Sequence, residues 1–268
     1  MPFEESGSVG HQSLASVFAT SDDVAECLRR GGDLGTVDAT GSCFAELIEL
    51  LMLRRNSPER VQIRDSSPRG AQFRALLSSE CAFRWSDGVG LYHAAPGCAS
   101  LADEVNDFAD RARVALGEAG MVSQASLRLS GALHELLCNI DEHAGSNATC
   151  LAGYSVEEGE AWVCVADTGD GVLAGYEGAA LGEKPSDSRE ALRWAVLRHR
   201  SRTGEPGRGT GFQTVANALR SLDGSLRVRS DDASLELAQQ SSDVSSLVRE
   251  QGHLRGFVVS MHVRWARS

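Results

Sequence analysis

The sequence predicts an α/β protein, with a small α/β domain over residues 1–97 followed by a larger α/β unit over residues 98–268. Three observations lead to this fold class. Short apolar runs alternate with helix-period patterns in the first hundred residues, as in small α/β domains. An amphipathic helix is predicted over residues 127–145 and a buried strand over residues 161–166. A last strand, over residues 257–265, places alternate apolar residues on one face.

Composition and charge are those of an ordinary globular chain. Of the 268 residues, 42% are hydrophobic and 24% are charged, which is enough for a buried core. A net charge of -11 argues against a broad nucleic-acid surface, because such surfaces need clustered Lys and Arg. A small anionic ligand needs only a few local donors. We expect a cytoplasmic protein without a signal peptide, membrane span, zinc site or disulfide framework, since none of these patterns is found and the seven Cys are scattered.

In the first 97 residues, the strand segment Val-Asp-Ala-Thr at 37–40 is followed by a helix, a short basic turn and Val-Gln-Ile-Arg at 61–64. The order and length of these segments loosely resemble the STAS domains of anti-sigma-factor antagonists. Thr40 or Ser42 stands where such domains carry a phospho-acceptor, and a helix N-cap explains either residue as well. The loop AAPG at 94–97 marks the expected domain boundary. In this part, strands are predicted at 34–39 and 61–64, and helices at 22–30, 44–55 and 70–77.

The helix over residues 127–145 carries a polar row beside its apolar stripe. Glu135, Asn139 and His143 follow one another at intervals of four, so they lie one above another along the helix. A carboxylate, an amide and an imidazole in such a row can face a metal ion or a bound ligand. A solvated helix edge carries the same residue types, so this row by itself leaves both interpretations open.

Two later segments contain closely spaced glycines that let the backbone approach a ligand. Asp167 ends a buried strand and is followed by Gly169 and Gly171, a pattern that fits a ligand-binding turn and also an ordinary acidic turn. A second set of glycines precedes a helix predicted over residues 212–222, where free amide N–H groups and the helix dipole favour phosphate. A plain mobile connection is the alternative there. This second set comprises Gly207, Arg208, Gly209, Thr210 and Gly211.

Together, Glu-x-x-x-Asn-x-x-x-His, Asp-x-Gly-x-Gly after a strand and Gly-x-Gly-x-Gly before a helix resemble the Bergerat ATP-binding fold of the GHKL superfamily. That superfamily contains DNA gyrases, heat-shock chaperones, histidine kinases, mismatch-repair ATPases and anti-sigma-factor serine kinases. The resemblance covers roughly residues 100–268 and implies an α/β sandwich in which helices cover a mixed sheet. It also implies ATP and Mg2+ as cofactors.

The resemblance gives each motif residue a role. Asn139 would hold Mg2+ against the triphosphate, and Glu135 would be the general base that activates water or an acceptor hydroxyl. Asp167 would accept a hydrogen bond from the adenine amino group, and His143 would order the end of its helix. Gly169 and Gly171 would let the backbone pass beneath the adenine. A lid over the phosphates would be formed by Gly207, Arg208, Gly209, Thr210 and Gly211.

One departure from the family pattern concerns the last strand. Family members commonly place a Thr near its start to complete the adenine contact, whereas here Gly256 is followed by Phe257. Adenine recognition would then be weaker, or a polar insertion predicted over residues 231–252 would supply the missing group.

Within the superfamily, the chain is most similar to the anti-sigma-factor serine kinases. A sensor histidine kinase needs a phospho-acceptor His outside the ATP site, and the only His-Glu or His-Asp dipeptide is His134-Glu135. Gyrases, chaperones and mismatch-repair ATPases carry long transducer domains beyond this fold. Two functions remain: a signalling kinase or ATPase acting on a Ser or Thr of a protein partner or on water, and an ATP-gated binding module with little or no catalysis. The partner, the acceptor residue and the oligomeric state, a homodimer included, stay open.

Overall fold

The computed structural model confirms the α/β fold class. It describes residues 14–67, 82–86, 88–94, 102–143, 148–157, 159–198, 200, 211–220, 222, 224–240 and 243–266. The helices are α1 (Leu14–Val17), α2 (Ala19–Arg29), α3 (Phe44–Asn56), α5 (Ala102–Glu118), α6 (Ser123–His143), α7 (Gly171–Glu177), α8 (Ser188–Leu192), the π-helical turn η1 (Arg193–Leu197) and α9 (Gly211–Arg220). The strands are β1 (Gly35–Asp38), β2 (Val61–Arg64), β3 (Ala82–Ser86), β4 (Val89–Ala94), β5 (Cys150–Glu157), β6 (Glu160–Asp167), β7 (Ser225–Gln240) and β8 (Asp243–Arg264).

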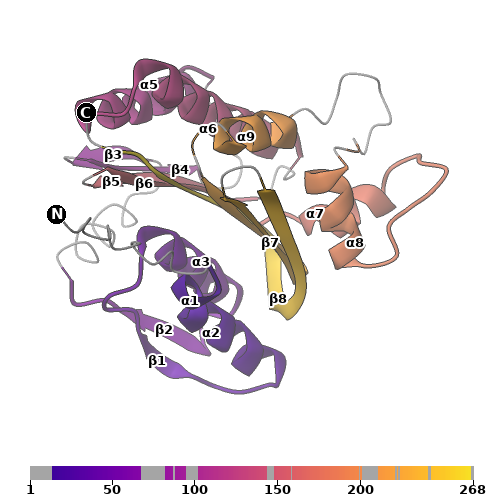
Figure 1. The fold of residues 1–268 in the computed structure, drawn as a ribbon. Helices are drawn as coiled ribbons and strands as arrows, with labels where there is room; N and C mark the ends of the chain where they lie inside the picture. Colours follow the sequence, from indigo (N-terminus) through magenta and orange to yellow (C-terminus); the bar gives the residue numbers. More distant parts are fainter. Residues whose placement is uncertain are drawn as a thin grey trace, which may run out of the picture.

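A six-stranded sheet of order β3-β4-β5-β6-β8-β7 lies at the centre of the molecule (Figure 1). Every neighbouring pair of these strands is antiparallel. The mixed sheet expected from the sequence is therefore wrong for the described strands. The reason is the path of the chain: β6 and β7 run in the same direction, but β8 lies between them and pairs with each in the antiparallel sense.

Helices cover both faces of this sheet, and the small sheet lies outside them on one side (Figure 1). On one face α5, α6 and α9 enclose a core that contains Leu129, Leu133 and Val163. On the other face α2 and α3 enclose a second core that contains Ile48 and Trp162. Beyond α3, β1 and β2 pair in parallel, as two strands joined by a helix do.

The amphipathic helix predicted from residue 127 onward is confirmed as part of α6. Its predicted apolar stripe is buried against the sheet, and each side chain of this kind contributes about 2 kcal/mol when it leaves water. The stripe comprises Leu129, Leu133, Leu136, Leu137 and Ile140.

From Phe44 to Leu50, α3 is buried on all sides, because it lies between the two sheets, whereas the sequence predicts one apolar face; the last three residues of α3 are exposed. Cys43 caps its N-terminus: the Cys43 Sγ accepts a hydrogen bond from the Glu46 N–H at 3.3 Å. The N-cap explanation for Thr40 and Ser42 is therefore wrong. Thr40 is exposed and its hydroxyl contacts the Ser66 hydroxyl at 3.0 Å.

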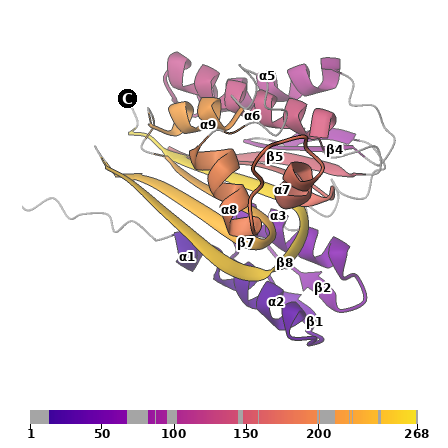
Figure 2. The same ribbon diagram turned by 90° about the vertical axis from the view of Figure 1, so that its right-hand side faces the viewer.

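Two regions differ from the expected domain arrangement. β3 and β4 precede the boundary expected at residue 97, yet they belong to the large sheet, where β4 pairs with β5. The expected insertion over residues 231–252 instead forms the outer part of the long β7–β8 hairpin, beside α7 and α8 (Figure 2). Its alternating residues Ala233, Leu235 and Leu237 are buried in the α6-side core. The helix predicted over residues 70–77 lies outside the described residues.

Buried charges join this hairpin to the N-terminal helices. Arg227, Arg229 and Glu49 are all fully buried. The Glu49 carboxylate accepts hydrogen bonds from the Arg227 Nε at 2.8 Å and from the Arg229 Nη1 at 3.2 Å. Arg227 also donates to Asp22 and, at 2.8 Å, to Glu236. Since an unpaired buried charge costs several kcal/mol, the cluster favours one position of α2 and α3 against β7.

Candidate functional site

Asp167 is the last residue of β6, and it faces the side of the sheet that α6 covers. Alternation along β6 places Asp167 on the same face as Val163 and Val165, which are buried in the α6-side core. The Asp167 side chain is 6% exposed, and its Oδ1 accepts a hydrogen bond from the Gly169 N–H at 2.7 Å. Burial raises the pKa of this carboxyl to about 6, although the Gly169 hydrogen bond opposes the rise. A carboxylate has room for further donors, so Asp167 can still accept from a ligand.

The turn after Asp167 is held against the segment that follows α6. The Thr168 N–H donates to the Thr149 carbonyl at 3.1 Å, and the Thr149 N–H donates to the Thr168 Oγ1 at 2.8 Å. Cys150, the next residue, pairs with Asp167 in the sheet. The segment that connects α6 to β5 therefore reaches the sheet beside Asp167.

Gly171 opens α7 with a φ of +84°, and it contacts β7. A Cβ at this position would lie 2.8 Å from the Ser230 Oγ and 2.7 Å from the Asp231 Oδ1. Ser230 accepts a hydrogen bond from the Val172 N–H at 2.9 Å, and Asp231 accepts one from the Leu173 N–H. The structure thus accounts for Gly171 by the capping of α7, and its role beneath an adenine stays a prediction.

Gly256 explains why no Thr precedes Phe257, where the sequence predicts the start of the last strand. Its φ is +93°, and a Cβ would overlap the carbonyl oxygen of Asp167. Only glycine therefore lets the turn after Asp167 pass so close to β8. The nearby polar groups come from Ser230, whose hydroxyl donates to the Gly256 carbonyl at 2.9 Å, and from Asp231. Asp231 has a φ of 55°, which Asp tolerates better than most residues. Neither residue is part of a recognisable sequence motif. The one local sign of them is that the strand alternation of residues 225–230 stops there.

Glu135 and Asn139 are half-buried on α6, next to the core residues Leu136 and Ile140. Within the described part of the chain, neither side chain has a hydrogen bond or ion pair, and none joins them to Asp167. α6 packs against both α9 and β6. Both side chains are therefore available to a ligand at the edge of the core. The side chain of His143, the last residue of α6, lies outside the described residues.

The second glycine segment is only partly visible. Gly207, Arg208, Gly209 and Thr210 lie outside the described residues, and Gly211 is the first residue of α9. The next side chain, Phe212, packs edge-on against Phe257, with ring centroids 5.8 Å apart. Phe257 pairs with Asp167 in the sheet. The start of α9 and the end of β6 therefore meet at one end of the sheet, on the face that α6 covers.

The oxygen atoms that α6 offers suit a magnesium ion that is also bound by the phosphates of a nucleotide. Among the described residues there is no group of three or more His, Cys, Asp or Glu that could hold a metal ion. Mg2+ bound with a nucleotide commonly takes only one or two oxygens from the protein, so the available amide oxygen of Asn139 suits that role.

Three further findings bear on the class of protein. The described cysteines Cys27, Cys43, Cys138, Cys150 and Cys164 are free thiols. Among the described helices, none combines the length and the apolar character needed to cross a bilayer. No protein-family model matches the sequence, and a search of curated proteins finds none similar to it.

Proposed function

We propose that this protein binds Mg-ATP in a Bergerat-type site and acts in signalling as an ATPase or as a kinase for a Ser or Thr of a protein partner. One observation supports the proposal: Asp167 and Phe212, at the start of α9, lie at the same end of the sheet, on the face that α6 covers. The proposal adds the polar row of α6 to the same ligand site, since α6 packs against both β6 and α9.

Each residue then has a distinct task. Asp167 would accept a hydrogen bond from the adenine amino group. Its carboxylate is buried and accepts one backbone hydrogen bond, so a ligand donor would replace hydrogen bonds to water that the carboxylate loses on folding. Asn139 would offer its amide oxygen to Mg2+, which neutralises phosphate charge when bound. Glu135, one helical turn earlier, would take a proton from water or from an acceptor hydroxyl.

Calorimetry with ATP and Mg2+ tests the binding itself, and no heat up to millimolar ligand would refute it. Asp167→Asn removes an ionised acceptor of one hydrogen bond, a loss of about 1.5–3 kcal/mol, which is roughly tenfold to hundredfold in affinity for ATP. Inorganic triphosphate, which lacks adenine, is the matched ligand, and we expect the substitution to leave its affinity nearly unchanged. Equal losses for both ligands would remove the adenine role of Asp167.

The pKa of Asp167 predicts a pH dependence for the base-recognition step. The ionised form accepts from the adenine amino group, so affinity should fall about tenfold per pH unit below pH 6, where the carboxyl becomes protonated. Adenosine is the ligand to use, because phosphate groups titrate in the same range. Affinity for adenosine that stays constant from pH 5 to pH 8 would contradict the assignment.

Glu135→Ala separates catalysis from ATP-gated binding. If Glu135 is the general base, the substitution should keep Mg-ATP affinity and reduce release or transfer of the γ-phosphate by at least a hundredfold. Unchanged slow turnover would favour the binding module. Glu104→Ala, an exposed carboxylate on α5, is the matched control and should leave both quantities as they are. Incubation of the protein and a lysate with γ-labelled ATP would identify the acceptor.

A further inference from the structure

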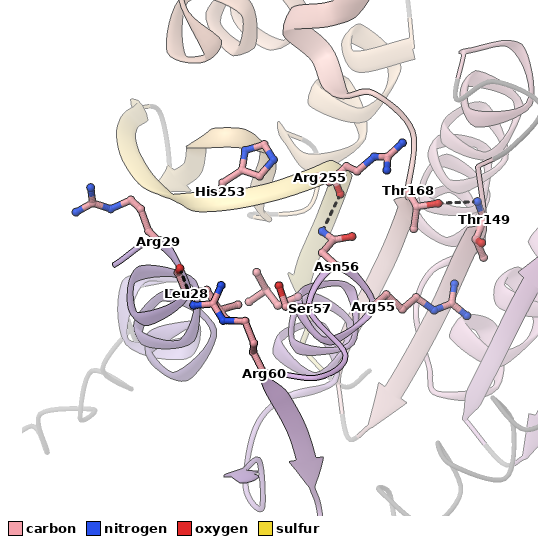
Figure 3. A pocket seen from close by; sticks show the side chains of 11 residues that line it. Leu28, Arg29, Arg55, Asn56, Ser57, Arg60, Thr149, Thr168, His253 and Arg255 are labelled. Atoms are coloured by element: carbon pink, nitrogen blue, oxygen red, sulfur yellow. Dashed lines mark hydrogen bonds between the residues drawn. The ribbon is translucent and has the colours of Figure 1, made fainter. Parts of the chain in front are cut away.

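A cavity rich in arginine lies beside the turn that follows Asp167. It has a volume of about 660 Å³, within the range of small-molecule sites. It lies between the N-terminal helices α2 and α3, the β8 strand and the turn that follows β6 (Figure 3). The residues around it are Leu28, Arg29, Leu53, Arg55, Asn56, Ser57, Arg60, Thr149, Thr168, His253 and Arg255.

The charge of this cavity is opposite to that of the whole chain. Four Arg and one His line it, and the described lining includes neither Asp nor Glu, although the net charge of the protein is -11. Two of these arginines have carboxylate partners outside the cavity. Arg29 pairs with Glu26 at 2.6 Å, and Arg255 approaches Asp170 at 3.7 Å, a pair in which both side chains are largely exposed. Neither partner fills the cavity.

The other two arginines have only neutral partners among the described residues. Arg60 donates to the backbone carbonyls of Leu28 and Gly32. Arg55 contacts the His93 Nε2 at 2.8 Å, and loss of hydration lowers the pKa of its guanidinium. A guanidinium has five N–H donors, so each of these two retains donors and an uncompensated charge for an anion.

Hydroxyl and amide groups complete the donor set. The Thr168 Oγ1 accepts from the Thr149 N–H, which leaves its own hydrogen free to donate. In Figure 3, Arg55 extends from α3 toward Thr149 and Thr168, whereas Arg29 and Arg60 lie at the opposite end of the cavity, beside Leu28. Donors at two ends suit a ligand with two anionic groups. No described aromatic ring lines the cavity except the imidazole of His253, so a stacked nucleobase is not favoured.

We infer that this cavity binds a small ligand that carries two phosphate groups, held by Arg55 and Arg60 at its two ends. Arginine suits phosphate because its planar N–H groups bond two oxygens at once. The cavity adjoins the proposed nucleotide site, because Thr168 directly follows Asp167, but its arginines come from α2, α3, the segment after α3 and β8. The inference does not require that the protein bind ATP.

Calorimetry on the full chain in EDTA, at 0.15 M salt, tests the inference with two probes. Inorganic pyrophosphate represents an inorganic source of paired phosphates, and fructose 1,6-bisphosphate represents an organic one. We expect one molecule of at least one probe to bind, and Arg55→Gln and Arg60→Gln each to weaken it tenfold or more, the value of one charge-assisted hydrogen bond. Absence of heat with both probes would overturn the inference.

Controls separate this site from the nucleotide site and from general charge attraction. Arg113→Gln removes a surface arginine of α5 and should leave probe affinity unchanged. Asn139→Ala should also leave it unchanged, and Arg55→Gln should leave Mg-ATP affinity unchanged. If the Arg60 variant fails to fold, the loss expected for Arg55→Gln decides the test. Binding that Arg113→Gln weakens as much as Arg55→Gln does would mean nonspecific attraction and would refute the site.

Discussion

The buried carboxyl of Asp167 makes a strong prediction about stability that does not depend on any ligand. Its pKa of about 6 in the folded protein lies above the ordinary value of 3.8, and burial is the main cause. When a folded pKa is raised, the folded state holds its proton more tightly than the unfolded state does. The stability that the protonated Asp167 contributes is therefore fully present below about pH 4 and is lost as the pH rises through about 6.

The difference sets the expected size of the effect. The two pKa values differ by roughly 2 pH units, and each unit corresponds to about 1.4 kcal/mol, so ionisation of Asp167 costs up to about 3 kcal/mol at neutral pH. Asp167→Asn keeps an oxygen that can accept from the Gly169 N–H and cannot ionise. We therefore expect the variant to unfold at higher urea concentration than the wild type at pH 7 to 8.

Urea unfolding at several pH values between 4 and 8 measures this gain. The free energy difference between variant and wild type should rise from near zero at pH 4 to about 3 kcal/mol above pH 6. Asp110→Asn on α5, whose side chain is 70% exposed, is the control and should change stability by only a few tenths of a kcal/mol. A difference that does not vary with pH, or a variant less stable than the wild type at pH 8, would refute the reasoning.

Two further predictions concern the packing that holds the parts together. Glu49→Gln should destabilise the protein by about 3–5 kcal/mol in urea unfolding, because it leaves two buried guanidiniums without their shared carboxylate, whereas Asp22→Asn, with a side chain 19% exposed, should cost clearly less. Equal losses would mean that burial does not set the cost. Gly256→Ala should lower stability by about 2–5 kcal/mol, since it combines a positive φ with overlap of the Asp167 carbonyl. Gly41→Ala, at a φ of +95° with open space around it, should cost only about 1–2 kcal/mol, and a similar loss at both sites in thermal unfolding would contradict the overlap.

Local patterns in the sequence predict those parts of the structure that a single segment determines. The apolar residues of α6 recur at helical spacing, and Val259, Met261 and Val263 alternate along β8. The type of each element can therefore be predicted from its own segment of the sequence. The turn after Asp167 is also predictable locally, since a carboxylate and two glycines within five residues are a turn signal by themselves.

Features that depend on distant partners are not visible in this way. β4 and β5 are buried on both faces, between α3 and α5, so neither shows the alternation of a half-exposed strand. Ser230 and Asp231 contribute to the site only because β7 lies two strands from β6, across Gly256. Ser230 and Asp167 each pair with Phe257, which follows Asp167 by ninety residues, and no short window contains all three.

The buried ionic cluster explains why the N-terminal segment and the large sheet behave as one structure. Apolar contacts between α3 and the sheet are nondirectional, so burial alone permits several positions of the helix. Arg227 and Arg229 require hydrogen-bond acceptors in specific positions, and the Glu49 carboxylate accepts from both of them in the observed position of α3. Such a cluster adds little net stability compared with well-packed apolar groups, but every displaced arrangement leaves a buried charge unpaired. The same position of α3 sets Arg55 opposite Thr168, and thereby forms the arginine-lined cavity.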